Sequence, residues 1–197
     1  KQWDWLVQVA DSVDLIVIAG DLLDLGSAVE MDVQILVTLR YLRRLRGLTR
    51  LAVASGNHDL RPTDSEHEAR WLQQARTDQL AIDGESFLLD GTWITVCPWW
   101  DGPISKQRCG AMLEVADAKR TGTWIWIHHA PPQDSPVSWT GKTFYGDLNL
   151  TQWIDRFQPN IVLGGHVHNA PFANEGSWVD QLGSTWVFNP GRQIGPV

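Results

Sequence analysis

The stretch LIVIAGDLLD, residues 15 to 24, decides the fold class. Its first half, Leu15 to Ala19, is a continuous apolar run, which is typical of a β-strand covered on both faces. The run ends at Gly20 and Asp21, so a carboxylate follows directly after a buried strand. In open α/β sheets, ligands bind beyond the carboxyl ends of the strands. The stretch therefore predicts an α/β protein with a polar site at the end of this strand.

The same arrangement recurs three more times along the chain. The further examples are LAVA followed by GNHD at 56–59, TWIWI followed by HHAPP at 128–132, and IVL followed by GGHVH at 164–168. One histidine after one strand would more often be a structural residue. Four clusters of Asp, Asn and His at strand ends instead favour a divalent metal centre, because these side chains are hard or borderline ligands.

Helical periodicity fills the segments between the strands. It predicts helices over residues 1–10, 30–46, 66–76, 106–120 and 151–158. The dipeptide Asp90-Gly91 predicts a hairpin between strands at 85–89 and 93–97, and short strands are expected at 177–179 and 185–188. The 197 residues fit one domain over 1–197.

Composition restricts the partners. The 16 basic and 23 acidic residues give a formal charge of −7, which disfavours binding to nucleic acid or to an anionic membrane. The chain has no apolar run long enough to span a bilayer, and residues 1–5 lack the apolar core of a signal peptide. Cys97 and Cys109 form no CxxC motif, so free thiols and a cytoplasmic location are expected. Composition makes no prediction of the oligomeric state.

The motif order GDxxD, GNHD, HAPP and GGHVH resembles the calcineurin-like metallophosphoesterase superfamily. The resemblance covers most of the chain. It implies an α/β/β/α sandwich, in which two mixed sheets pack together and helices flank them, and a hydrolase that uses two divalent metal ions. Mn is the expected metal, with Fe and Zn as alternatives, because mixed His, Asn and Asp ligation suits all three.

The resemblance also implies roles for individual residues. Asp21 corresponds to the carboxylate that bridges the two metals. The remaining expected ligands are Asn57, His129 and His166 for one metal and His168 for the other. His129 is preferred to its neighbour His128, because the family places the ligand two residues before the first proline of this motif, here Pro131.

The expected reaction is hydrolysis of phosphate esters, most of all phosphodiesters, by a hydroxide shared between the two metals. The resemblance places His58 toward the substrate, where it would protonate the leaving alkoxide, a task that suits an imidazole because imidazoles titrate near neutrality. Asp59 is expected to orient His58, and its alternative is a loop-capping carboxylate. A binding scaffold that has lost hydrolysis is the alternative function.

Two features leave alternatives open. Family members carry an Asp-x-His motif on a strand before GDxxD, and no Asp-x-His occurs in this sequence. We expect either that further sequence precedes these residues, which we favour, or that this is a variant with one metal. For the substrate, Trp99 and Trp100 are candidates for a stacking wall against a small phosphate ester, and ordinary loop packing is their alternative.

Overall fold

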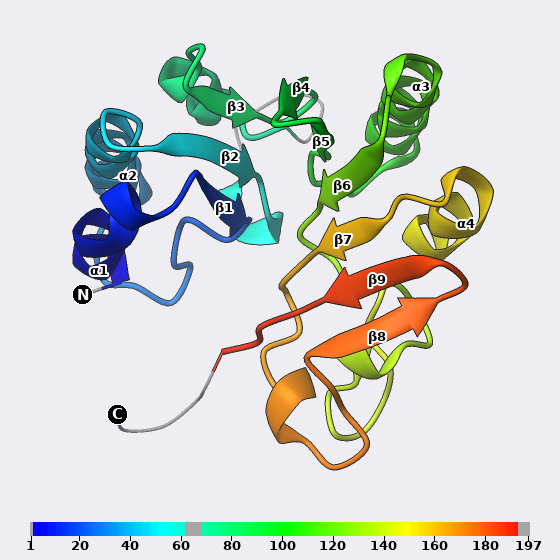
Figure 1. The fold of residues 1–197 in the computed structure, drawn as a ribbon. Coiled ribbons are helices and arrows are strands. Elements are labelled where there is room, and N and C mark those ends of the chain that lie inside the picture. The colour runs from blue at the N-terminus through cyan, green and yellow to red at the C-terminus, as the bar shows by residue number, and fades with distance from the viewer. Residues whose placement is uncertain (1, 62–67, 193–197) are drawn as a thin grey trace.

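The computed structural model describes residues 2–61 and 68–192, and its strands form two sheets (Figure 1). The first sheet has the order β1-β2-β3, with strands Leu15–Ala19, Arg50–Ala54 and Leu80–Ile82, and both pairs are parallel. The second has the order β4-β5-β6-β7-β9-β8, with strands Ser86–Leu89, Thr92–Val96, Thr123–Ile127, Ile161–Leu163, Thr185–Phe188 and Val179–Leu182. It is mixed, because β4 and β8 pair antiparallel at its two edges.

Helices cover the outer faces of the two sheets (Figure 1). The first sheet is flanked by α1 (Gln2–Val9) and α2 (Met31–Leu45), and the second by α3 (Pro103–Lys119) and α4 (Leu148–Phe157). Short 3-10 helices lie in the connections: η1 Ala10–Ser12, η2 Asn57–Asp59, η4 Arg70–Ala75, η5 Pro136–Ser138 and η6 Ala170–Phe172. The result is a four-layer α/β/β/α sandwich, and the predicted fold class is confirmed.

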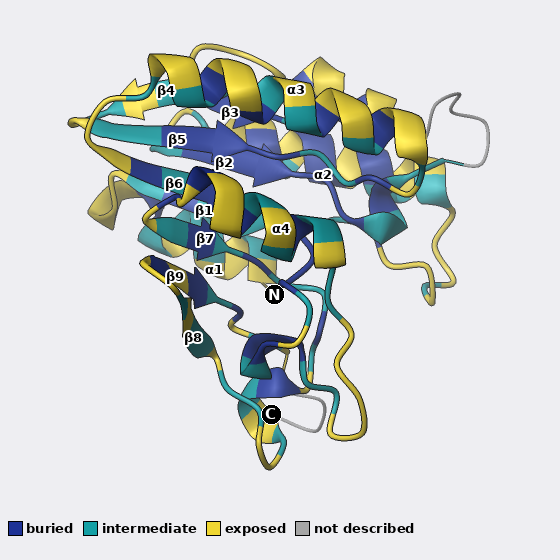
Figure 2. Ribbon diagram, turned by 90° about the vertical axis from the view of Figure 1, so that its right-hand side faces the viewer, coloured by how far each residue is buried: buried dark blue, intermediate teal, exposed yellow. Residues whose placement is uncertain are grey.

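Strand alternation divides the core into three layers. On β6, Trp124 and Trp126 point to one face, where their rings meet at 5.1 Å and pack under α3 and α4. Ile127 belongs to the opposite face and packs between the sheets together with small residues of the first sheet such as Ala52 and Ala54. Figure 2 shows the buried strands between helices with exposed outer faces. Each large buried side chain contributes about 1.5–3 kcal/mol to stability.

The predicted hairpin is present, and its turn residues Asp90 and Gly91 both have positive φ, as a type I′ turn requires. The strand β3 was not predicted from the sequence. Part of the helix predicted at 66–76 lies outside the described residues, and the described part forms the 3-10 helix η4. The strand predicted at 177–179 instead occupies Val179–Leu182.

Among the described residues, β1 pairs with β2 alone, so it lies at an edge of the first sheet. The expected Asp-x-His strand stays a prediction. No helix in the described part of the chain is long and apolar enough to cross a membrane.

Candidate metal centre

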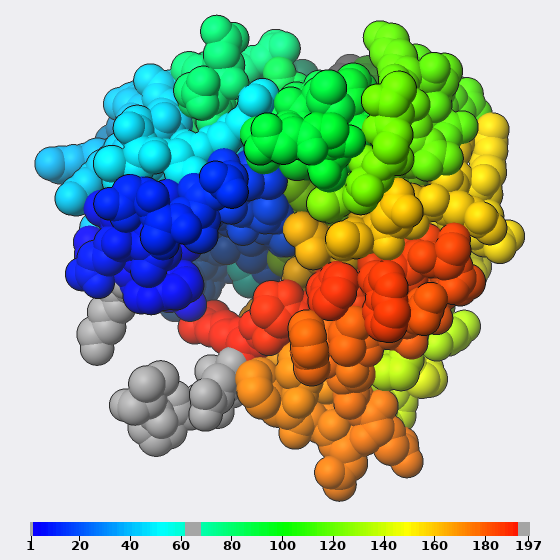
Figure 3. All heavy atoms as spheres, in the orientation of Figure 1, coloured from blue at the N-terminus to red at the C-terminus, as the bar shows by residue number. Residues whose placement is uncertain are grey.

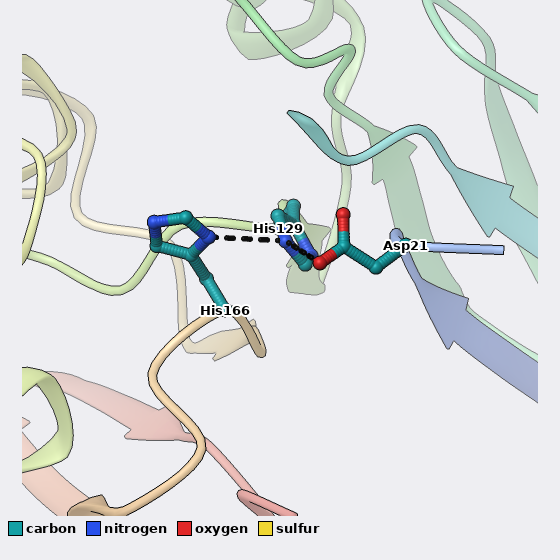
Figure 4. Close-up of side chains that lie close together, drawn as sticks. All are labelled: Asp21, His129 and His166. Carbon is teal, nitrogen blue, oxygen red and sulfur yellow. Dashed lines mark hydrogen bonds and ion pairs between the residues drawn. The ribbon is translucent and has the colours of Figure 1, made fainter. Parts of the chain in front are cut away.

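Three predicted ligands meet at the carboxyl ends of strands from both sheets (Figure 4). Asp21 follows β1, His129 follows β6 and His166 follows β7. The Nε2 atom of His129 lies 3.1 Å from Asp21 Oδ2 and 3.2 Å from His166 Nδ1. One ligand atom from each residue lies within 4.8 Å of the other two, which is the spacing that a shared metal ion requires. In the space-filling view the surface is hollowed where the N-terminal part faces the C-terminal part (Figure 3).

Two motif glycines allow this close approach. Gly20 has a φ of +85°, and a Cβ there would lie 2.5 Å from His129 Nδ1. A Cβ on Gly56 would overlap the carboxylate and backbone nitrogen of Asp21. Asp21 and His166 themselves have φ values of 54° and 66°, which cost energy for residues other than glycine and are concentrated at functional sites.

The hydrogen bonds of His129 determine which ring nitrogen faces the site. Its Nδ1 lies 2.6 Å from the carbonyl oxygen of Ala19, and a carbonyl only accepts, so Nδ1 donates the proton. In the neutral ring, Nε2 then presents a lone pair toward Asp21 and His166. A backbone carbonyl is a common partner of the second nitrogen of a metal-ligating histidine.

Electrostatics keep the ligand atoms in the form that binds a cation. Burial alone would raise the pKa of Asp21, but the hydrogen bond and charge of His129 and the His58 N–H outweigh it, and this pKa is lowered. Burial, followed by the proximity of His129, lowers the pKa of His166 to about 4. At neutral pH the Asp21 carboxylate is therefore ionised and the His166 imidazole is neutral, and both are donors that a divalent metal accepts.

Asn57 provides an independent test of this assignment. Its Oδ1 is buried and has no hydrogen-bond partner among the described residues. Its neighbours Gly56 and His58 both contact Asp21, the latter by donating its backbone N–H to Oδ1 at 3.1 Å. An unpaired buried amide oxygen costs about 1–3 kcal/mol, and a metal ion at this site would satisfy it. The residues present therefore fit a bound cation.

Comparison with known proteins identifies the family. The family model described as calcineurin-like phosphoesterase matches residues 2–170. The chain belongs to this family. A solved crystal structure is similar over 95% of this chain and 84% of its own, with a TM-score of 0.68 and 17% identity. The crystal structure of TT1561 of Thermus thermophilus is similar over 96% and 83%, with a TM-score of 0.64 and 15% identity. At these identities the likeness concerns the fold alone, and the comparison with curated proteins gives no match.

Membership in the calcineurin-like phosphoesterases confirms the resemblance and implies metal-dependent hydrolysis of phosphoesters. His168, the ligand expected for a second metal, lies outside the cluster of three. Burial, followed by the charge of Arg192, lowers the pKa of His168, while the charge of Asp21 opposes this. Its backbone carbonyl accepts a hydrogen bond from Arg192 N at 2.9 Å.

The structure places His58 beside the cluster and Asp59 beneath it. The half-buried His58 ring has its Nδ1 3.7 Å from Asp21 Oδ2. Asp59 is fully buried, and its carboxylate accepts from Gly56 N at 2.7 Å and from Leu23 N at 3.0 Å. These bonds support the loop-capping alternative, since no hydrogen bond between Asp59 and the His58 ring occurs in the described structure. Burial raises the pKa of Asp59 to about 7.

The two tryptophans after β5 have different environments. The Trp99 ring lies 5.6 Å from the His129 ring and 5.4 Å from the His166 ring, so Trp99 borders the cluster. Trp100 is only 5% exposed and donates its Nε1 to Asp147 at 2.8 Å. For Trp100, this burial favours the alternative of ordinary loop packing over a substrate wall. Trp100 instead stacks on His128 with a ring separation of 3.9 Å, which places His128 in the core and His129 in the site.

Two residues near the site were missed. Tyr145 is 60% exposed and stacks on His166 with ring centroids 5.1 Å apart. Buried Asn189 donates from Nδ2 to the carbonyls of Val137 and Val167, at 2.9 Å each. The second bond fixes the loop between the two histidines of the GGHVH motif. Nothing in the local sequence indicates either contact.

Proposed function

We propose that this protein is a phosphodiesterase for small phosphate esters and that it works with two divalent metal ions, Mn in the first place. The convergence of Asp21, His129 and His166 carries the proposal, because one carboxylate oxygen and two imidazole nitrogens lie there within 4.8 Å of one another. The unpartnered oxygen of Asn57 supports it. Asp21, Asn57, His129 and His166 would hold one metal, and Asp21 and His168 would contribute to the other.

Bound divalent ions supply Lewis-acid stabilisation of the phosphoryl oxygens and an activated water nucleophile. The residues of the chain itself position the ligands around the site. Asp59 ties the GDxxD turn to the GNHD turn, because it accepts from Leu23 N and Gly56 N, and it thereby sets the distance from Asp21 to Asn57 and His58.

His58 is the proposed proton donor to the leaving alkoxide. Its backbone N–H and its ring nitrogen both face the Asp21 carboxylate, and its side chain remains about one third exposed. An imidazole in this position is oriented by the carboxylate and is accessible to a substrate oxygen. General acid catalysis of this kind contributes about 10²–10⁴ to a rate.

Hydrolysis of bis-p-nitrophenyl phosphate, with and without added Mn²⁺, tests the proposal. Asp21→Asn is expected to lose bound metal and activity together. His58→Ala is expected to keep its metal content, measured by elemental analysis, and to lose about 10²-fold or more in kcat. Asp24→Asn is the matched control, because Asp24 belongs to the same motif but lies exposed, and its carboxylate accepts only from Gly26 N in the described hydrogen bonds.

Equal metal loss in Asp21→Asn and His58→Ala would contradict the separate roles. A folded wild-type protein that binds Mn²⁺ but hydrolyses neither diesters nor monoesters would favour the binding scaffold. We further propose a small-molecule substrate rather than nucleic acid, from the charge of −7, and a reducing cytoplasmic location, from the free thiols of Cys97 and Cys109.

A further inference from the structure

A cavity of about 240 Å³ lies beside the metal centre. Ser55 and Asp83 line it from the ends of β2 and β3, and Trp99 lines it from the end of β5. Residues 105, 108, 109 and 112 of α3 line it as well, and this spacing of three and four places them on one helix face. Trp99 also contacts the rings of the metal-site histidines. The cavity and the metal centre are therefore neighbours that share one indole.

The cavity lining is mainly apolar, and Asp83 contributes a carboxylate to it. Asp83 Oδ1 accepts from Ser55 N at 2.8 Å, and Ser55 Oγ accepts from Trp99 N at 3.0 Å. Among the described residues, Ser55 is the only hydrogen-bond partner of this carboxylate, so further lone pairs are available to a ligand. Arg108 forms an ion pair with Glu68 at 2.8 Å, so these two wall charges offset each other. The Asp83 carboxylate in this mainly apolar wall suits an uncharged planar group with N–H donors.

We propose that this cavity binds a purine base of the substrate, with its N–H edge toward Asp83 and its face toward Trp99. The inference rests on the proposed function, since the base would belong to an ester held at the metal centre. The volume lies below the ~300–1,000 Å³ of drug-sized sites, which suits one fused ring system. Guanine is the best match, because two adjacent N–H donors on its edge pair with both oxygens of one carboxylate.

Calorimetric titration of the chelator-treated protein with guanosine, adenosine and ribose tests the cavity without hydrolysis. Guanosine is expected to bind more tightly than adenosine, and ribose alone to give no binding. Asp83→Asn should weaken the binding of guanosine at least tenfold, because the carboxylate that accepts both N–H groups is lost. Asp117→Asn is the matched control, because Asp117 lies on α3 but outside the cavity lining, and it pairs with Arg120.

Met112→Trp provides a second variant, because a larger side chain fills the cavity from α3 and should abolish nucleoside binding. Near-ultraviolet circular dichroism verifies that each variant is folded. A wild-type protein that binds no nucleoside, or equal affinities of the Asp83→Asn and Asp117→Asn proteins, would overturn the inference. Nucleoside binding without metal-dependent hydrolysis of bis-p-nitrophenyl phosphate would support the base site but contradict the proposed function on which its role in catalysis rests.

Discussion

Replacement of His128 by phenylalanine should make the protein less sensitive to acid. The His128 ring is fully buried, neither ring nitrogen has a hydrogen-bond partner in the described structure, and it stacks on Trp100 at an interplanar angle of 5°. Burial lowers the pKa of His128 from 6.5 to about 3. Phenylalanine keeps a flat ring against Trp100 and removes the titration.

The direction of the pH effect on stability follows from which state, folded or unfolded, binds the proton on His128. As the pH falls below 6.5, the unfolded chain protonates His128 while the folded protein does not, so acid favours unfolding. The contribution of the neutral His128 ring to stability is fully present above pH 6.5 and is lost progressively toward pH 3. The whole interval corresponds to about 5 kcal/mol at most, and the part between pH 7 and pH 5 to about 2 kcal/mol.

Thermal unfolding at pH 7 and pH 5, followed by circular dichroism in the presence of a chelator, measures this difference. The fall in Tm of the wild-type protein should exceed that of His128→Phe by about 4–8 °C, since 1 kcal/mol corresponds to about 2–4 °C at this size. His128→Leu should lose the same acid sensitivity, which separates titration from ring stacking. Equal falls in Tm for the wild-type protein and both variants would refute the reasoning.

Three further substitutions test the packing around the site. Gly56→Ala should abolish metal binding, measured by elemental analysis, because its Cβ would overlap Asp21; retained binding would contradict the close approach. Asn189→Ala should lower the free energy of unfolding by about 2–4 kcal/mol in urea, since two buried carbonyls lose their donor. Trp100→Phe should cost about 1–3 kcal/mol in the same assay, because Asp147 loses the indole N–H; an unchanged midpoint would show that this bond contributes nothing.

The strands and their terminal ligands were predictable because the information is local. Each apolar run has its own boundary, and the polar residues that follow Ala19 and Ile127 lie where parallel strands end. The parallel pairing brings such ends to one edge of a sheet. Family membership and the fold were predictable for the same reason, since four short motifs in a set order suffice.

The partners of Asp59 and of the two tryptophans were not predictable, because they depend on contacts between distant residues. Asp59 caps Leu23 N, 36 positions away, and nothing next to Asp59 in the sequence indicates this. Trp99 and Trp100 are neighbours with the same side chain, but one borders the metal site and the other bonds to Asp147, 47 positions on. Local sequence cannot distinguish them, because their difference arises only when β5, β6 and α4 assemble.

The second sheet explains why its ligands are held so closely. Its hydrogen-bond ladder continues beyond the strand ends: Cys97 N donates to Ile127 O, His128 N to Leu163 O, and Gly164 N to Phe188 O, at 2.8–3.0 Å. Each bond joins the first residue after one strand to the last residue of the next. The register of the ladder therefore sets the relative heights of Trp99, His129 and His166, which follow within three residues of these bonds. Since a one-residue slip reverses the face of every side chain, the metal site and its aromatic border form together or not at all.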